Sequence, residues 1–124
     1  MKNILNKKII ERYSRQIVLK NVGSIGQKEI LKAKVLIIGA GGLGCPVADY
    51  LSRAGVGTIG IVDFDKVNLS NIHRQSLYET RDVNKFKVDV LKKKIKLINP
   101  SIKVKAFKKR ITDKNSKQII KSFD

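Results

Sequence analysis

Residues 34–44 read KVLIIGAGGLG, and this stretch decides the fold of the chain. Its first part, residues 34–38, is a nearly continuous apolar run, which is typical of a parallel strand buried on both faces. The run passes directly into the glycine-rich turn Gly39–Gly44, and Pro46 suits the first turn of a helix. A strand, a glycine-rich turn and a helix in this order are typical of a phosphate-binding unit.

The residues after the turn predict a second strand. We expect the helix to run to about Arg53 and to stop at Gly55, because glycine commonly ends helices. Thr58–Asp63 is again apolar up to its last residue, which predicts another buried strand. Strand, turn, helix and strand together form one βαβ unit of about 30 residues.

Hydrophobic spacing predicts the remaining elements. Val88, Leu91 and Ile95 fall on one face of a helix, whereas the segment Phe64–Glu79 before it is polar and irregular. The other expected elements are helices over Asn84–Ile98 and Ser116–Ser122, a third strand over Lys103–Phe107, and, before the first strand, a helix over Asn3–Gln16, a break at Gly23–Gly26 and a short helix over Gln27–Lys32. The predicted fold is therefore α/β: a Rossmann-like parallel sheet of about three strands with flanking helices, preceded by an N-terminal helical segment.

Composition and charge limit the function classes. No apolar run approaches the roughly 18 residues of a membrane span, and Met1–Ile10 lacks the apolar core of a signal peptide, so we expect a cytoplasmic protein. Cys45 is the single cysteine, which excludes an internal disulfide and a multi-cysteine zinc site within these residues. The net charge of +17 lies mostly after residue 83. Because the lysines there fall between helix-spaced apolar residues, we interpret them as a solvated surface, and nucleic acid is not an expected partner.

The glycine turn and the end of the second strand predict a nucleotide site. Glycines let a backbone approach a phosphate closely, and the helix N-terminus then offers unpaired N–H donors. Asp63 follows the second strand, where a carboxylate can accept hydrogen bonds from ribose hydroxyls, although it could also only cap the strand. Asp65 fits a second ribose contact and the start of a turn equally well. The predicted phosphate contacts are Gly39, Gly41, Gly42 and Gly44.

A third motif separates ATP from NAD, both of which present a ribose and a phosphate chain. The stretch after Asp65 carries Ser70, Asn71 and Arg74, and Lys87 falls on the first turn of the next helix. Arginine clamps phosphate with two hydrogen bonds, and lysine adds a point charge. An NAD fold needs neither group near its pyrophosphate, whereas a reaction that expels pyrophosphate needs both, because negative charge builds on the leaving group.

Several motifs together carry a family resemblance. The stretches RYSRQ from Arg12, GAGGLGCP from Gly39, AGVGTIGIVDFD from Ala54 and VNLSNIHRQ from Val67 resemble the ThiF/MoeB/HesA adenylating enzymes, which are related to the ubiquitin-activating enzymes. Ile-Asn-Pro ending at Pro100 also matches. The resemblance therefore covers most of the chain in the order and spacing of the family.

The resemblance implies an adenylyltransferase. Such enzymes bind ATP with Mg²⁺, and the C-terminal carboxylate of a ubiquitin-like sulfur-carrier protein attacks the α-phosphate, giving an acyl-adenylate and pyrophosphate. The pathways implied are those of molybdopterin, thiamine or tRNA thiolation. By position, Asp63 would hold the ribose, Asn71 and Arg74 would contact the phosphates, and Lys87 would stabilise their charge. Arg15 is similar to the arginine that reaches the ATP of the neighbouring subunit in the family's homodimer.

The resemblance also has limits. Family members usually have a glycine and a proline where this chain has Asn84 and Phe86, which leaves the start of the helix and the aim of Lys87 open. The family's metal-binding aspartate and its carrier-binding sheet are expected after Asp124. We therefore divide the sequence into an N-terminal helical segment, residues 1–32, and a truncated ATP-binding domain of the ThiF type, residues 33–124.

Two other functions fit parts of the pattern. One is a fragment of an NAD-binding oxidoreductase, and the other is a catalytically inactive binding or dimerisation module. Among the remaining reactive side chains, His73 is interpreted as a loop residue beside Arg74, and Cys45 as a small buried residue. Tyr13 and Tyr78 are interpreted as packing residues.

Overall fold

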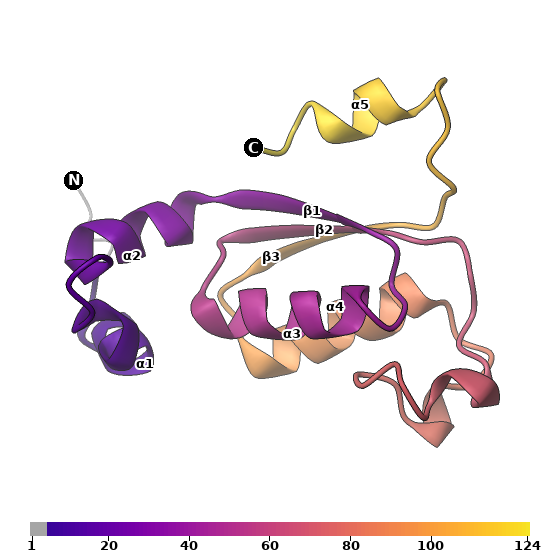
Figure 1. The fold of residues 1–124 in the computed structure, drawn as a ribbon, viewed down its shortest axis with the longest axis horizontal. Helices are drawn as coiled ribbons and strands as arrows, with labels where there is room; N and C mark the ends of the chain where they lie inside the picture. Colours follow the sequence, from indigo (N-terminus) through magenta and orange to yellow (C-terminus); the bar gives the residue numbers. More distant parts are fainter. Residues whose placement is uncertain (1–4) are drawn as a thin grey trace.

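The sheet predicted from the sequence is present in the computed structural model, which describes residues 5–124 (Figure 1). Its strands are β1 (Lys34–Ile38), β2 (Thr58–Val62) and β3 (Lys103–Phe107). They are parallel and lie in the order β1-β2-β3, with Ile37 opposite Ile61 and Ile61 opposite Ala106. The prediction of an α/β fold with three parallel strands is confirmed.

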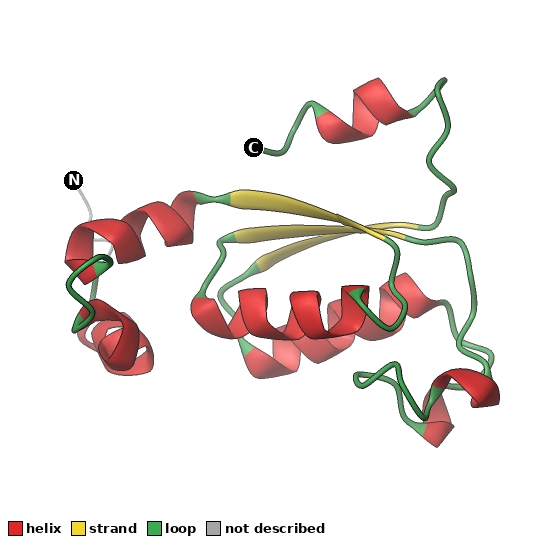
Figure 2. Ribbon diagram, viewed as in Figure 1, coloured by secondary structure: helices red, strands yellow, loops and turns green. Residues whose placement is uncertain are grey.

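Two helices cover one face of the sheet. Figure 2 shows α3 (Gly44–Ala54) and α4 (Lys87–Ile98) side by side beneath the strands that they connect. The core lies between these helices and the sheet, and β2 in the centre contributes the fully buried Ile59 and Ile61. From the helices come the buried residues Cys45, Ala48, Val88, Leu91 and Ile95. Burial of these side chains supplies the main favourable term in folding.

The expectation that β1 is buried on both faces is wrong. The strand order leaves β1 at an edge of the sheet, and of its five residues only Ile37 is buried. Ile38 is 58% exposed: side chains alternate along a strand, and since Ile37 points into the core, Ile38 points to the face that α3 and α4 do not cover. The central strand β2 meets the expectation, with four of its five residues buried.

The C-terminal segment lies over the opposite face. Figure 1 shows α5 (Ser116–Ile120) across the sheet from α3 and α4. Phe123 packs onto Gly60 of β2, where a β-carbon would lie 2.3 Å from the phenyl ring. Phe123 also meets Phe107 edge-on, with ring centroids 6.4 Å apart. Asp124 then hydrogen-bonds to Lys34 at the free edge of β1.

The N-terminal helices are α1 (Lys7–Ile17) and α2 (Gly23–Lys32). The predicted break at Gly23–Gly26 is wrong, because α2 begins at Gly23 and Gly26 N–H donates to the carbonyl of Val22 inside it. Glycine has a low helix propensity, but α2 is tied to the end of α3 by the buried Gln27, whose Nε2 donates to the Ala54 carbonyl. The expected helix start at Asn3 lies outside the described residues. Of the helices between residues 5 and 124, none is long and apolar enough to cross a membrane.

The predicted irregular segment, Phe64–Glu79, contains one short 3₁₀ helix, Leu69–Asn71, and a second one, Thr80–Asp82, follows it. The predicted start of the following helix at Asn84 is wrong, since α4 begins at Lys87 with Phe86 as its N-cap. Asn84 has φ 69°, a left-handed conformation that suits glycine best and asparagine next. This is the position where the related family usually has glycine, so a sharp turn here delays the helix.

Candidate functional site

The glycine turn Gly39–Gly44 lies where β1 ends and α3 begins (Figure 1). Its first residue is anchored to the neighbouring strand, because Gly39 N–H donates to the carbonyl of Val62 at 2.8 Å. At its last residue the backbone folds back on itself, and a β-carbon on Gly44 would lie 2.0 Å from the carbonyl oxygen of Gly39. Only glycine fits this position, so the turn brings the N-terminus of α3 directly to the strand end.

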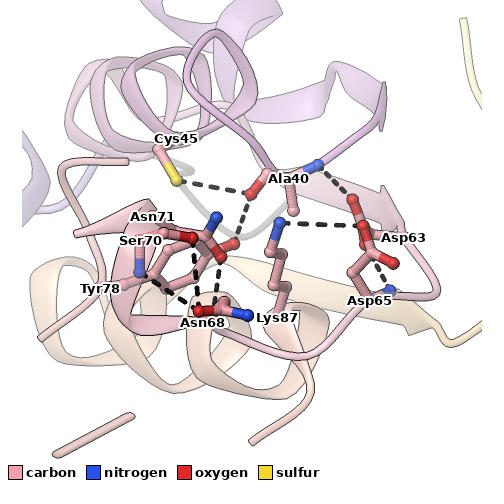
Figure 3. Close-up of polar contacts among 9 residues, drawn as sticks. All are labelled: Ala40, Cys45, Asp63, Asp65, Asn68, Ser70, Asn71, Tyr78 and Lys87. Atoms are coloured by element: carbon pink, nitrogen blue, oxygen red, sulfur yellow. Dashed lines mark hydrogen bonds and ion pairs between the residues drawn. The ribbon is translucent and has the colours of Figure 1, made fainter. Parts of the chain in front are cut away.

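The buried backbone of Ala40 is held through both its N–H and its carbonyl (Figure 3). Its N–H donates to Oδ2 of Asp63 at 2.8 Å, and its carbonyl accepts from the Tyr78 hydroxyl at 2.5 Å. Sγ of Cys45 lies 3.7 Å from the same carbonyl oxygen, a weaker contact. We name the side chains of Asp63, Cys45 and Tyr78 the turn support, because together they fix the orientation of the turn.

Burial changes the acidity of two members of the turn support. It raises the pKa of the Tyr78 hydroxyl far above its ordinary value, and the neighbouring Cys45 adds to the increase. Burial also raises the pKa of the Cys45 thiol, an effect that hydrogen bonds with Leu77 and Tyr78 reduce. Both groups therefore stay protonated at neutral pH and act as neutral donors. The interpretation of Cys45 as a small buried residue is confirmed, and Tyr78 has a polar contact that sequence reasoning missed.

The carboxylate of Asp63 links the turn to the chain that leaves β2. One oxygen holds Ala40, and the other accepts from the backbone N–H of Asp65 at 2.7 Å. The capping alternative for Asp63 is thus present in the structure, and the Asp65 carbonyl accepts from the backbone N–H of Lys87. A carboxylate with two oxygens accepts about four hydrogen bonds, so these two leave room for a ribose hydroxyl. The ribose contacts of Asp63 and Asp65 stay predictions.

The structure brings the third motif against the glycine turn. A β-carbon on Gly42 would lie 3.9 Å from Cγ of Arg74, and one on Gly41 would lie 3.7 Å from Nε2 of Gln75. These residues are more than thirty positions apart in the sequence. The predicted phosphate-contacting groups from two motifs therefore share one edge of the sheet, at the carboxyl ends of the strands, where open α/β sheets bind ligands.

Asn68 and Asn71 form a reciprocal cap around the first 3₁₀ helix. Asn68 N–H donates to Oδ1 of Asn71 at 2.8 Å, and Oδ1 of Asn68 accepts from the N–H of Ser70 at 3.3 Å. Arg74 closes the same loop, with Nη1 donating to the carbonyl of Ser70 at 2.9 Å and lying 2.8 Å from Nε2 of His73. His73 thus lies beside Arg74, as expected. Phosphate contacts of Ser70, Asn71 and Arg74 stay predictions.

Lys87 is a buried cation at the centre of this arrangement. Only 6% of the residue is exposed, although lysine is rarely buried without a partner. Its Nζ lies 3.9 Å from Oδ2 of Asp65, which is beyond hydrogen-bond distance, and its backbone N–H donates to the Asp65 carbonyl at 3.0 Å. Figure 3 shows the side chain directed toward Asp65, near Asp63. A largely buried lysine whose ammonium has only one long ion pair is costly to hold in place, and an anionic ligand would offset that cost.

A cavity of about 200 Å³ lies beside the turn. It is open at the strand ends, and Gly39 and Asp63 line it together with Phe64 and Arg110. The guanidinium of Arg110 lies 4.0 Å from the ring centroid of Phe64, which is typical of cation–π stacking. Neither residue was among the predicted site residues. The one available signal was their position after the second and third strands.

Arg15 lies apart from the rest of the predicted site. It is exposed on α1, and α1 packs near the C-terminal end of α3, where a β-carbon on Gly55 would collide with the Tyr13 ring. The glycine turn lies at the opposite end of that helix (Figure 1). Within one chain the structure therefore does not bring Arg15 to the turn. Within residues 5–124, no group of three or more His, Cys, Asp or Glu side chains is placed to hold a metal ion.

Comparison with known proteins agrees with this geometry, since the profile of the ThiF family matches residues 13–124. The chain belongs to the ThiF family. The match includes the glycine turn, the turn support, the Asn68–Gln75 stretch and Lys87. The resemblance that the sequence motifs indicated is confirmed.

Two relatives show the range of the family. The chain is 44% identical over 118 residues to a sulfur carrier protein adenylyltransferase of Thermus thermophilus, covering 95% of this chain and 44% of that protein. It is 46% identical over 115 residues to the adenylyltransferase and sulfurtransferase MOCS3 of Dictyostelium discoideum, covering 93% of this chain and 27% of that protein. The ThiF-family chain thus spans less than half the length of either relative.

Solved structures share the fold. E. coli TcdA, a tRNA N6-threonylcarbamoyladenosine dehydratase whose structure contains ATP, superposes with a TM-score of 0.88 at 25% identity, over 96% of this chain and 48% of that one. E. coli MccB, solved with MccA-N7isoASN, superposes with a TM-score of 0.78 at 31% identity, over 88% of this chain and 33% of that one.

Proposed function

We propose that this chain is the ATP-binding part of an adenylyltransferase that activates the C-terminal carboxylate of a ubiquitin-like sulfur-carrier protein. The observation that carries the proposal is the buried, poorly paired Lys87 next to a glycine turn that admits no side chain at Gly44. Names of relatives support the reaction class, because the Thermus protein is a sulfur carrier protein adenylyltransferase. Molybdopterin, thiamine and tRNA-thiolation carriers are all candidates as substrate.

In this proposal the phosphates of ATP lie between the glycine turn and the Asn68–Gln75 stretch. The backbone N–H groups at Gly41 and Gly42 and the side chains of Asn71, Arg74 and Lys87 would hold them. A carboxylate oxygen of the carrier would attack the α-phosphorus while pyrophosphate leaves. The chain would then act by positioning the reacting groups and stabilising negative charge, without a side-chain nucleophile.

The nucleoside would occupy the cavity beside the turn. Asp63 lines both the turn and the cavity, so its carboxylate is placed for a ribose hydroxyl, and Asp65 follows it. Phe64 offers an aromatic face for a base once Arg110 shifts. Mg²⁺ would accompany the phosphates, with ligands outside the described cluster of residues, and the reaction would take place in the cytoplasm.

A second copy of the chain would complete the site. Leu43, Val47 and Tyr50 form an exposed apolar stripe along α3, at helical spacing and starting in the glycine turn. A copy packed on that stripe would lie close to the nucleotide and would bring its own Arg15 there. The proposal therefore includes a homodimer with Arg15 acting on the neighbouring nucleotide, and treats residues 1–32 as the segment that carries this arginine.

Nucleotide binding by a Lys87→Met variant tests the proposal. We expect ATP affinity to fall by about tenfold or more, because a hydrogen-bonded charge contributes about 1.5–3 kcal/mol. Lys85→Met is the matched control, since the Lys85 side chain is 58% exposed and lies two residues away. The measurement is titration calorimetry with ATP and, separately, with NAD. Equal ATP affinity in both variants, or preference for NAD, would contradict the assignment.

ATP–pyrophosphate exchange with a candidate carrier distinguishes an enzyme from a binding module. Exchange that requires both ATP and a carrier ending in Gly-Gly supports adenylation. ATP binding without exchange, for the chain alone and for a longer polypeptide containing it, would favour the catalytically inactive alternative.

A further inference from the structure

Tyr78 is bound to the glycine turn by one hydrogen bond from its side chain. The residue is 3% exposed, and its hydroxyl donates to the Ala40 carbonyl at 2.5 Å. Within residues 5–124, the one other side chain that contacts that carbonyl is Cys45, whose sulfur is a weak donor at 3.7 Å. The Ala40–Gly41 peptide is therefore oriented mainly by Tyr78, and the Gly39–Ala40 peptide before it by Asp63.

The backbone connects Tyr78 to the predicted phosphate-contacting residues. Tyr78 N–H donates to the Gln75 carbonyl at 3.1 Å. In turn, the Asn71 carbonyl accepts from the N–H groups of Arg74 and Gln75, at 3.2 and 2.9 Å. This run of hydrogen bonds makes residues 71–78 one compact unit, so a shift of Tyr78 moves Asn71 and Arg74 with it.

Gln75 marks the place where this unit meets the turn. The residue is 4% exposed, and its Nε2 lies on the side of Gly41. Its Oε1 is the one buried side-chain polar atom within residues 5–124 that has no hydrogen-bond partner. Leaving such an atom unpaired costs free energy. The other contacts between the turn and residues 71–78 must therefore offset that cost.

We propose that Tyr78 is a positioning residue of the nucleotide site: its hydrogen bond to Ala40 keeps the glycine turn and the 71–78 unit in one fixed relation. The donors of the turn and those of Asn71 and Arg74 then face the same phosphate chain without rearrangement. The identity of the ligand rests on the proposed function, but the coupling between the two segments does not.

The test compares two tyrosines that differ in location. Tyr78→Phe removes the hydroxyl that holds Ala40, and Tyr13→Phe removes a hydroxyl that is also buried and hydrogen-bonded, to Asn99 at 2.8 Å. Amide hydrogen exchange is measured for the full chain, and ATP affinity is measured by calorimetry. In Tyr78→Phe we expect exchange to rise about fivefold or more in both residues 40–44 and residues 71–75, and ATP affinity to fall about fivefold. In Tyr13→Phe we expect exchange to rise in α1, with ATP affinity unchanged.

A milder variant keeps the test decisive if Tyr78→Phe does not fold. Cys45→Ala removes the weaker contact to Ala40 and leaves the 71–78 unit intact, so exchange should rise in residues 40–44 and not in residues 71–75.

Three outcomes would overturn the positioning role. They are unchanged exchange in both segments of Tyr78→Phe, a rise spread evenly over the chain, and equal rises in both segments of Cys45→Ala. If the wild-type chain binds no ATP, the proposed function fails instead, and the exchange data still decide the role of Tyr78.

Discussion

Two buried tyrosines lie at opposite ends of α3, and their hydroxyl groups bind different parts of the structure. Tyr78 lies at the start of the helix, where it holds the Ala40 peptide within the turn support. Tyr13 lies at the end, against Gly55, and its hydroxyl accepts from Nδ2 of Asn99. The first contact fixes a backbone segment that faces a ligand site, and the second fixes one helix against another.

The second region is a polar junction that joins the N-terminal helices to the sheet. Nε2 of Gln16 and Nε2 of Gln27 both donate to the Ala54 carbonyl, at 3.0 and 3.1 Å, and Gln16 also donates to Gln27. We name the side chains of Tyr13, Gln16, Gln27 and Asn99 the helix dock. Unlike the turn support, it contains no charged group, and its members contact the C-terminal end of α3.

The helix dock serves stability, whereas the turn support also sets the geometry of the ligand site. In the helix dock the side-chain N–H groups of Gln16, Gln27 and Asn99 all have hydrogen-bond acceptors, which rigidifies the junction. Near the turn support, Oε1 of Gln75 has no hydrogen-bond partner, and the ammonium of Lys87 has only a long ion pair, 3.9 Å from Asp65. Sites that await a ligand commonly carry such unmet interactions. Substitutions in the helix dock should therefore change the free energy of unfolding alone. Substitutions at the turn support should change both the free energy of unfolding and ATP affinity.

The largest effect is expected from Gly44→Ala. Its β-carbon would lie 2.0 Å from the Gly39 carbonyl oxygen, a backbone atom that cannot move without opening the turn. We expect the free energy of unfolding in urea to fall by about 3 kcal/mol or more, with loss of ATP binding. Gly42→Ala is the control, because its β-carbon meets nothing nearer than 3.9 Å. Equal stability of the two variants would show that the turn is not tightly packed.

Asn99→Ala tests the helix dock. The side chain is fully buried and bonds Tyr13, the Ser52 carbonyl and the Ser101 hydroxyl. Its removal leaves these partners unpaired, so unfolding free energy should fall by about 2–3 kcal/mol. ATP affinity of the folded variant should stay unchanged. The exposed Asn21 serves as the control for an asparagine substitution in the N-terminal region. A loss of ATP affinity in Asn99→Ala would mean that dock and site are coupled.

Cys45→Ala should have a smaller effect, on the turn side. The thiol is fully buried but its contact with Ala40 is long, so the variant loses mainly packing, about 1 kcal/mol of unfolding free energy. Thermal melting of the variant and of Val47→Ala, on the exposed face of the same helix, measures the difference. A loss of about 3 kcal/mol would instead rank the sulfur with Tyr78 as a main support of the turn.

The smallest effect is expected from Glu29→Gln on α2. Its carboxylate pairs with Lys32 at 2.8 Å, but both side chains are more than half exposed. Solvent and salt screen such pairs, so stability should change by less than about 0.5 kcal/mol. Melting curves at low and high salt would check this. A larger, salt-dependent loss would mean that charge, and not the helix dock, holds the N-terminal helices.

The elements built from local pattern could be predicted from the sequence. The bounds of β1 and β3 match the expected ranges, because apolar runs between turn residues define buried strands. The start of α2 was missed because the contacts of Gln27 are with residues distant in the sequence. The start of α4 was missed because Asn84 adopts a left-handed backbone conformation, which is rare for residues other than glycine. The exposure of Ile38 was missed because the pattern of one strand does not show which face of the sheet the helices cover.

For the site, the motifs indicated residue types but not their contacts. Asp63 was expected at a ribose, and the structure adds that its oxygens hold Ala40 and Asp65. Tyr78 was interpreted as packing, because nothing in the sequence around it indicates that its hydroxyl reaches residue 40. Arg110 and Phe64 were missed, since their stacking depends on the adjacency of β2 and β3.

The sequence alone determined the βαβ unit, the glycine turn, the family and the residue types suited to phosphate. Each depends on local spacing, which backbone geometry and hydrophobic periodicity fix. Tertiary structure alone decided that Arg74 lies along Gly42, that Lys87 is buried near Asp65, and that Tyr78 supports the turn. These contacts join segments separated by more than twenty residues, and only the parallel register of the sheet brings such segments to one edge.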